Sequence, residues 1–121
     1  MKKVILASVL AISAVSAHSA ASQTFCSGTP GNGSAVTLGT ATDQNYVKST
    51  FTPKCSANTH VSGEDGGSYY RVGAGSAKGK TRYAGTSAGG AVVAAGACAA
   101  ATGCAVSDAT TAMTSTYAPT S

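Results

Sequence analysis

The pattern of hydrophobic and polar positions separates an apolar leader from a remainder built of short alternating segments. Residues 4–15 form an uncharged, largely apolar run after a Lys-Lys start, and residues 16–21 are mostly small. A basic start, an apolar run and small residues in this order are typical of a secretory signal peptide, and the run is too short for a stable membrane span. We therefore expect a signal peptide over residues 1–21, cleaved within 17–21, followed by one small β-rich domain over 22–121.

Beyond the leader, short segments of alternating polarity are separated by clusters of Gly, Pro, Asn and Asp. Period-two alternation bounded by such residues predicts β-strands. The clearest alternation is in residues 46–52, where Val47 and Phe51 fall on one face. A Gly-rich turn at residues 63–67 predicts a hairpin between two of the segments. The predicted strands are 34–40, 46–52, 57–62, 68–73, 80–84 and 91–95.

The two ends of the domain are less regular than its middle. Residues 22–33 contain several Gly and a Pro, which predicts an extended N-terminal lead-in followed by a loop. At the C-terminal tail, Ser107 and Asp108 are suited to capping a helix, but the abundant Thr that follows favours strand or disorder, so all three states remain open. The whole pattern predicts an all-β fold: a small disulfide-stapled sandwich or barrel-like domain of short antiparallel strands.

Composition shows why such a domain needs cross-links. After residue 21 there is one Leu and no Ile or Trp, whereas all 15 Gly lie there, so the apolar core is thin. An exported chain with an even number of cysteines is expected to form disulfides. We favour the pairs Cys26–Cys55 and Cys98–Cys104, because Gly103 can turn the chain back between the last two. The cysteine spacing lacks the two-residue gaps and paired histidines of zinc sites, so we expect no metal and no cofactor.

Two motifs suggest catalysis but lack the residues that catalysis needs. Gly85-Thr86-Ser87-Ala88-Gly89 has the form of a nucleophile elbow and resembles the motif around the serine of cyanophycinase-like peptidases. That resemblance implies an activating histidine downstream, and no histidine follows Ser87. The stretch ending in Gly79-Lys80-Thr81 is similar to a phosphate-binding loop, but the glycine required five positions earlier is Ala74. We interpret both stretches as turns and expect no enzymatic activity.

A cluster of basic and aromatic residues is the one charge asymmetry in the domain. No acid lies between Asp65 and Asp108. Interleaved cations and aromatic rings can stack on sugars and hold an anionic polymer, whereas on an edge hairpin they can simply prevent wrong strand pairing. Cleavage of the signal peptide removes Lys2 and Lys3 and lowers the positive net charge of the remaining chain, so we expect no nucleic-acid partner. The candidate binding patch consists of Tyr69, Tyr70, Arg71, Lys78, Lys80, Arg82 and Tyr83.

The chain resembles short exported, disulfide-containing proteins of Gram-negative bacteria, many of which have no assigned activity. The strings that carry this resemblance are Phe51-Thr52-Pro53-Lys54-Cys55 and Lys78-Gly79-Lys80-Thr81. The resemblance implies no catalytic residues. From the signal peptide we expect a secreted or periplasmic location, with association to the cell surface as a further expectation.

Two functions fit these observations. The first is an exported, non-enzymatic structural protein, such as a subunit of an extracellular fibre, a pilus-like filament or a surface matrix, that self-associates by strand addition. The segment before Cys26 or the tail after Cys104 is the expected donor strand. The alternative is a monomeric secreted binding module that holds an anionic polymer or glycan with the Tyr69–Tyr83 hairpin.

Overall fold

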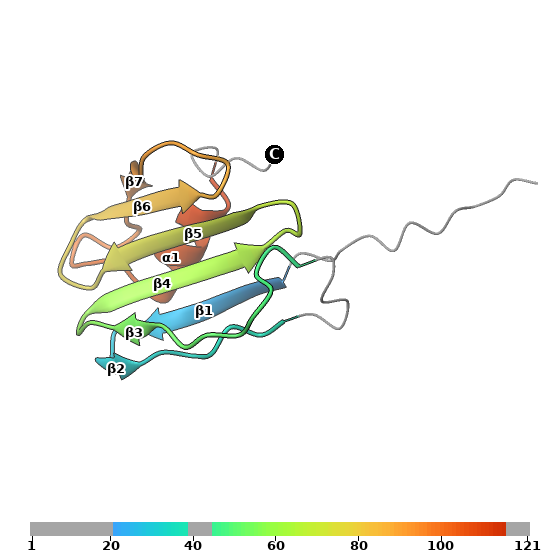
Figure 1. Cartoon of the computed structure of the whole chain (residues 1–121). Helices are drawn as coiled ribbons and strands as arrows, with labels where there is room; N and C mark the ends of the chain where they lie inside the picture. The colour runs from blue at the N-terminus through green and yellow to red at the C-terminus, as the bar shows by residue number, and fades with distance from the viewer. Residues whose placement is uncertain (1–20, 39–44, 116–121) are drawn as a thin grey trace, which may run out of the picture.

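A five-stranded antiparallel sheet is the main element of the fold (Figure 1). The computed structural model of the protein describes residues 21–38 and 45–115, so the predicted signal peptide lies outside the described residues except for Ala21. The sheet order is β1-β4-β5-β6-β7. The fold class expected from the sequence is confirmed: the domain is mostly β, with short antiparallel strands and two disulfides. The strands of the sheet are β1 (Ala21–Ser27), β4 (Thr59–Asp65), β5 (Tyr70–Ser76), β6 (Thr81–Thr86) and β7 (Val93–Ala97).

Strands β4 to β7 form a simple meander that matches four of the predicted strands to within a few residues. The first hairpin turn is shifted, because β4 continues to Asp65 and the chain turns over residues 66–69. In this turn Gly66 N–H donates to Tyr69 O at 2.9 Å, and Gly67 has a φ of +84°, which favours glycine. The Asp65 carboxylate accepts the Gly67 N–H at 2.9 Å and fixes the start of the turn.

Two of the predicted strands are wrong in the described residues. Residues 34–38 and 45–52 form no regular strand. They contact each other only through isolated bonds, such as Val36 N–H to Phe51 O at 2.8 Å. The Phe51 side chain is 49% exposed, so the alternation of this segment does not mark a buried face.

A buried carboxylate binds the first two backbone N–H groups of residues 46–52. The N–H groups of Tyr46 and Val47 donate to the two oxygens of Asp65 at 2.9 and 3.0 Å. These donors are therefore used by a side chain rather than by a neighbouring strand. The regular pairing of this region is instead the small hairpin of β2 (Gly31–Asn32) and β3 (Lys54–Cys55).

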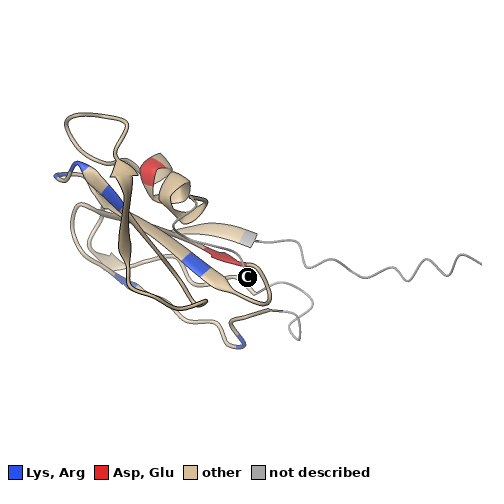
Figure 2. Cartoon of the chain, turned by 90° about the horizontal axis from the view of Figure 1, so that it is seen from above, with Lys and Arg blue, Asp and Glu red and all other residues tan. Residues whose placement is uncertain are grey.

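Helix α1 (Val106–Met113) covers one face of the sheet (Figure 2). The tail left open by the sequence is thus helical over these residues, and its cap is Ala105 rather than Ser107. The helix lies very close to β5 because Gly73 has no side chain: a Cβ there would stand 2.0 Å from Ala109 O. The small residues Ala84, Ala95 and Ala112 form the core on this side.

The connection between β1 and β4 covers part of the opposite face. The hydrophobic core between this connection and the sheet consists of Phe25, Cys26, Val36 and Cys55. Leu38, Val47, Val61 and Tyr70 pack against it. A register shift between Thr24 and Cys26 in β1 allows the adjacent Phe25 and Cys26 to be buried together. The Cys26–Cys55 bond then ties β1 to β3, with 5.6 Å between the Cα atoms.

Candidate functional site

The seven residues of the predicted binding patch do not form one surface. Arg71 lies opposite Glu64 in the β4–β5 pair and forms an ion pair with it. The Arg71 guanidinium also lies 5.6 Å from the centre of the Tyr69 ring. Both charged side chains are largely buried, so this arginine is neutralised inside the protein. Arg71 and Tyr69 therefore stabilise the hairpin and leave little free charge for a ligand.

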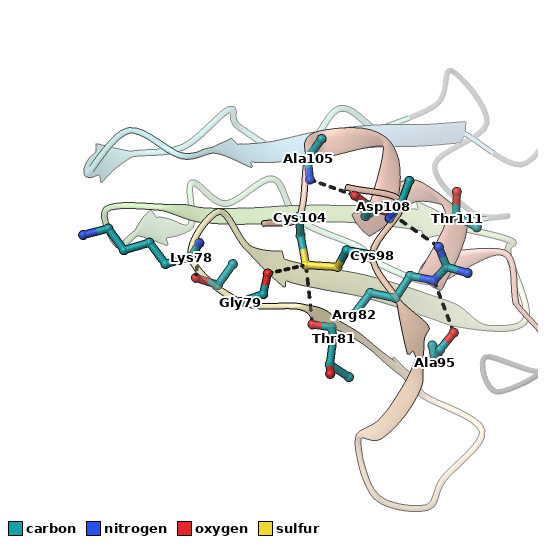
Figure 3. The surroundings of a disulfide bond; sticks show 12 residues. Lys78, Gly79, Thr81, Arg82, Ala95, Cys98, Cys104, Ala105, Asp108 and Thr111 are labelled. Atoms are coloured by element: carbon teal, nitrogen blue, oxygen red, sulfur yellow. Dashed lines mark hydrogen bonds and ion pairs between the residues drawn. A yellow bond between two sulfur atoms is a disulfide. The ribbon is translucent and has the colours of Figure 1, made fainter. Parts of the chain in front are cut away.

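Arg82 is also engaged in the structure, on the face covered by α1 (Figure 3). Its Nη1 lies 3.5 Å from Asp108 Oδ1, and its Nε donates to Ala95 O at 3.2 Å. Asp108 is buried and accepts two further bonds, from Ala105 N–H at 2.8 Å and Ala99 N–H at 2.9 Å. The bonds from Ala105 and Ala99, together with the Arg82 charge, hold the pKa of the Asp108 carboxyl below its usual range. Arg82 thus joins β6, β7 and the first turn of α1.

Tyr70 belongs to the core on the opposite face. It packs against the cluster around Phe25. Its hydroxyl lies close to Gly63: a Cβ added to Gly63 would be 2.8 Å from the Tyr70 hydroxyl oxygen. Burial, and secondly the negative charge of Asp65, raises the pKa of Tyr70 to about 12. Tyr70 is therefore a neutral packing residue at physiological pH.

The remaining three residues of the patch, Lys78, Lys80 and Tyr83, are exposed. Lys80 and Tyr83 lie at a groove with a volume of about 400 Å³ on the sheet face opposite α1. Ala74 and Tyr83 face each other across β5 and β6 and form part of its floor. The groove is lined by Thr59, Ala74, Gly75, Ser76, Gly79, Lys80, Thr81 and Tyr83.

Charge is distributed unequally between the interior and the surface. In the described part of the chain the three acidic residues, Glu64, Asp65 and Asp108, are each less than a tenth exposed. The four lysines there are all exposed, and Figure 2 shows the basic positions spread over strands and loops. The described surface is therefore cationic, although the net charge of the chain is small relative to its length.

The edge strand β7 is the second unusual feature. It is the last strand of the sheet and pairs only with β6 among the described residues. No charged residue occurs between Arg82 and Asp108, and Val92, just before β7, is 71% exposed. The structure thus leaves a short, uncharged strand at the edge of the sheet (Figure 1).

The opposite edge of the sheet, β1, is covered by the chain itself. Ser34 N–H donates to Phe25 O at 3.0 Å. The Gln23 side chain donates to Ala35 O at 2.5 Å and accepts the Thr37 N–H at 3.0 Å. The lead-in expected to be a donor strand is therefore β1 of its own sheet, whereas no described strand pairs with the outer edge of β7.

Ser87, the serine of the elbow-like motif, has a structural role in the β5–β6 pairing. Its Oγ accepts the Tyr70 N–H at 2.8 Å, and its own N–H donates to Tyr70 O at 2.8 Å. This reciprocal pair extends the hairpin by one step beyond Thr86. The motif is therefore the end of β6, with Gly85 and Thr86, followed by a turn over residues 87–90.

His60 is a buried polar residue whose environment the sequence does not reveal. It lies between Ser27 and Gly75 in the β1–β4–β5 ladder, and its Nδ1 has no hydrogen-bond partner in the described part of the protein. Over the same residues, no group of three His, Cys, Asp or Glu side chains is placed to hold a metal ion. His60 is thus a single polar group within the sheet rather than part of a cluster.

Comparison with known proteins gives no family for this chain. No protein-family model, curated protein or solved structure matches it. Within the described residues, none of the helical structure has the length and hydropathy needed to cross a bilayer. The two disulfides indicate an oxidising, extracytoplasmic environment.

Proposed function

We propose that the protein is an exported, non-enzymatic structural protein whose copies associate through the edge of β7. The observation that carries this proposal is the uncharged strand β7 at one edge of the sheet. The strand at the opposite edge, β1, is covered by residues 34–37 of the same chain. An edge strand presents unpaired N–H and C=O groups, and monomeric proteins usually protect such edges with Lys, Pro or a covering segment. Among the described residues, β7 has a bulge at Ala95 and a bond from Arg82 Nε to Ala95 O, and it has no Lys, no Pro and no covering strand.

The geometry favours a two-fold symmetric pair as the first step of assembly. Because residues 34–37 cover the outer edge of β1, the edge of the five-stranded sheet that a β7 edge can pair with in the described part is the β7 of another copy. Such an isologous contact closes on itself and yields a dimer with one continuous sheet. A fibre or matrix then requires a second contact between dimers.

The strength expected of this contact is modest. β7 has five residues, and each backbone hydrogen bond contributes a net of roughly 0.5–1.5 kcal/mol. Apolar contact by small side chains such as Val93 and Ala94 adds to this. The association should depend on protein concentration and respond little to salt, because no charged pair contributes to it.

Lysine substitutions on the edge strand test the proposal. Ala94→Lys and Ala97→Lys place like charges opposite each other in a β7–β7 pair, at positions that are exposed in the single chain. The matched control is Thr52→Lys, which adds the same charge at an exposed loop position away from the sheet edge.

Sedimentation equilibrium over a range of concentrations measures the outcome. We expect wild type and Thr52→Lys to dimerise at high concentration, with little change up to about 0.5 M salt, where charges are screened within a few ångströms. The two β7 variants should stay monomeric. A wild-type protein that is monomeric at every concentration, or β7 variants that dimerise as well as wild type, contradicts the proposal.

A further inference from the structure

The groove beside Tyr83 lies on a part of the sheet that residues 21–38 and 45–115 leave uncovered. The connection between β1 and β4 packs against the cluster around Phe25 and Val61, whereas Tyr83 on β6 remains 46% exposed. The groove volume of about 400 Å³ lies within the range of small-ligand sites. This hollow is on a sheet face and is separate from the backbone edge of β7.

The lining of the groove combines three kinds of chemistry. Tyr83 offers an exposed aromatic face, on which the apolar C–H face of a sugar ring can pack. Thr59, Ser76 and Thr81 bring hydroxyl groups that can donate or accept hydrogen bonds. Lys80 brings an ammonium group to the rim.

The charge of the site points to an anionic ligand. Within residues 21–38 and 45–115, neither Lys78 nor Lys80 forms an ion pair, whereas Arg71 and Arg82 do. The acids of this part of the chain are buried, so no described carboxylate competes for the two ammonium groups. In Figure 3 the Lys78 side chain extends away from the disulfide and from the other labelled side chains.

The number of exposed aromatic side chains at the groove favours a sugar over a nucleic acid as the ligand. Sites for single-stranded nucleic acid stack successive bases on several aromatic side chains along a basic groove. Here one exposed ring, Tyr83, is combined with three hydroxyl-bearing residues and Lys80. The extracytoplasmic environment indicated by the disulfides is also one in which acidic polysaccharides are abundant polyanions.

We propose that this groove binds a uronic acid unit of an acidic polysaccharide. The sugar ring lies on Tyr83, its hydroxyl groups bond to the hydroxyls of the lining, and its carboxylate pairs with Lys80. This inference does not depend on dimerisation through β7, because the groove uses the face of β5 and β6 rather than an edge.

Calorimetric titration with a hexamer of galacturonic acid tests the site in the mature protein. Its methyl-esterified form is the matched ligand, since it keeps the rings and loses the charge. The variants are Tyr83→Thr and Lys80→Gln, and the control is Lys54→Gln, an exposed lysine on β3. All three positions are exposed, so the fold should tolerate the changes.

We expect each groove variant to weaken binding about tenfold, since one charge-assisted contact or one stacked ring is removed. Lys54→Gln should change the affinity less than about twofold, and the esterified hexamer should bind about tenfold more weakly than the acid. The proposal is overturned by an absence of binding at millimolar hexamer, by equal affinity for the ester, or by tighter binding of a hexamer of deoxythymidylate.

Discussion

The acidic side chains of this protein connect elements that are distant in the chain. Asp108 binds two backbone N–H groups and Arg82, and Asp65 binds the N–H groups of Tyr46, Val47 and Gly67. A buried carboxylate that accepts several hydrogen bonds is well compensated for its lost hydration. These acids therefore act as connectors within the fold.

Tyr70 provides a pH-dependent test of the core at the residue scale. Its folded pKa of about 12 lies above the value near 10 of an unfolded chain. The contribution of this group to stability is fully present below pH 10 and is lost as the pH rises through 12, because only the unfolded chain ionises easily in that interval. We expect a loss of roughly 1–2 kcal/mol, allowing for solvent screening of a half-buried group.

The measurement compares wild type with Tyr70→Phe. Absorbance at the tyrosinate band should show an ionisation near pH 12 in wild type that the variant lacks, and urea unfolding at pH 9 and 11 should show a smaller decline for the variant. If the ionisation that disappears in Tyr70→Phe lies near pH 10, the side chain is not buried as described.

At the same scale, sequence reasoning identified the charged residues but missed most of their partners. Glu64 and Arg71 are directly opposite in the β4–β5 pair, which a hairpin with the correct turn would have revealed. The predicted turn at 63–67 included Glu64 and so removed it from the strand. The partner of Arg82 is Asp108, 26 residues away on a helix, and no local pattern indicates that contact.

At the scale of elements, the contact between α1 and β5 depends on the absence of a side chain at Gly73. A Cβ at this position would lie 2.0 Å from Ala109 O and 2.4 Å from Met113 N, both in the helix backbone. We expect Gly73→Ala to lower the free energy of unfolding by about 1–3 kcal/mol, because the helix must move away from the sheet.

The control for this prediction is Gly79→Ala in the β5–β6 turn. A Cβ there meets only Ser76, at 3.3 Å from its Cβ. Its unfolding free energy should stay within about 1 kcal/mol of wild type, since a compatible Gly→Ala change mainly restricts the unfolded chain. Equal stability of the two variants in urea unfolding would show that α1 does not rest on Gly73.

The elements differ in how far local sequence determines them. The meander of β4 to β7 is set by alternation and by Gly-rich turns, both of which are visible in the sequence. Residues 46–52 alternate equally well but form no strand, and their first two N–H groups bind the Asp65 carboxylate, a contact made only in the folded chain. The helix was ambiguous because its buried face consists of Asp108, Ala109, Ala112 and Met113 rather than a large apolar stripe.

At the scale of the whole molecule, two disulfides cross-link a small core. The structure pairs Cys26 with Cys55 and Cys98 with Cys104, the pairing favoured from the sequence, with separations of 29 and 6 residues. The loop-entropy relation gives about 3.6 kcal/mol for the longer loop and about 2.4 kcal/mol for the shorter one.

We therefore expect the Cys26→Ala/Cys55→Ala double variant to be less stable than the Cys98→Ala/Cys104→Ala variant by about 1 kcal/mol. Urea unfolding of both variants and of wild type at neutral pH measures the difference. The opposite order of stability would indicate that packing of Cys104 against Gly75 outweighs loop closure.

The pairing of neighbours along the chain has a consequence for biosynthesis. Synthesis proceeds from the N-terminus, so Cys55 is the first possible partner that Cys26 meets, and it is the native one. Cys98 and Cys104 emerge together after that bond can already have closed. Oxidation in the order of emergence would form the native pairs, so we expect oxidative folding of this protein to proceed without a disulfide isomerase.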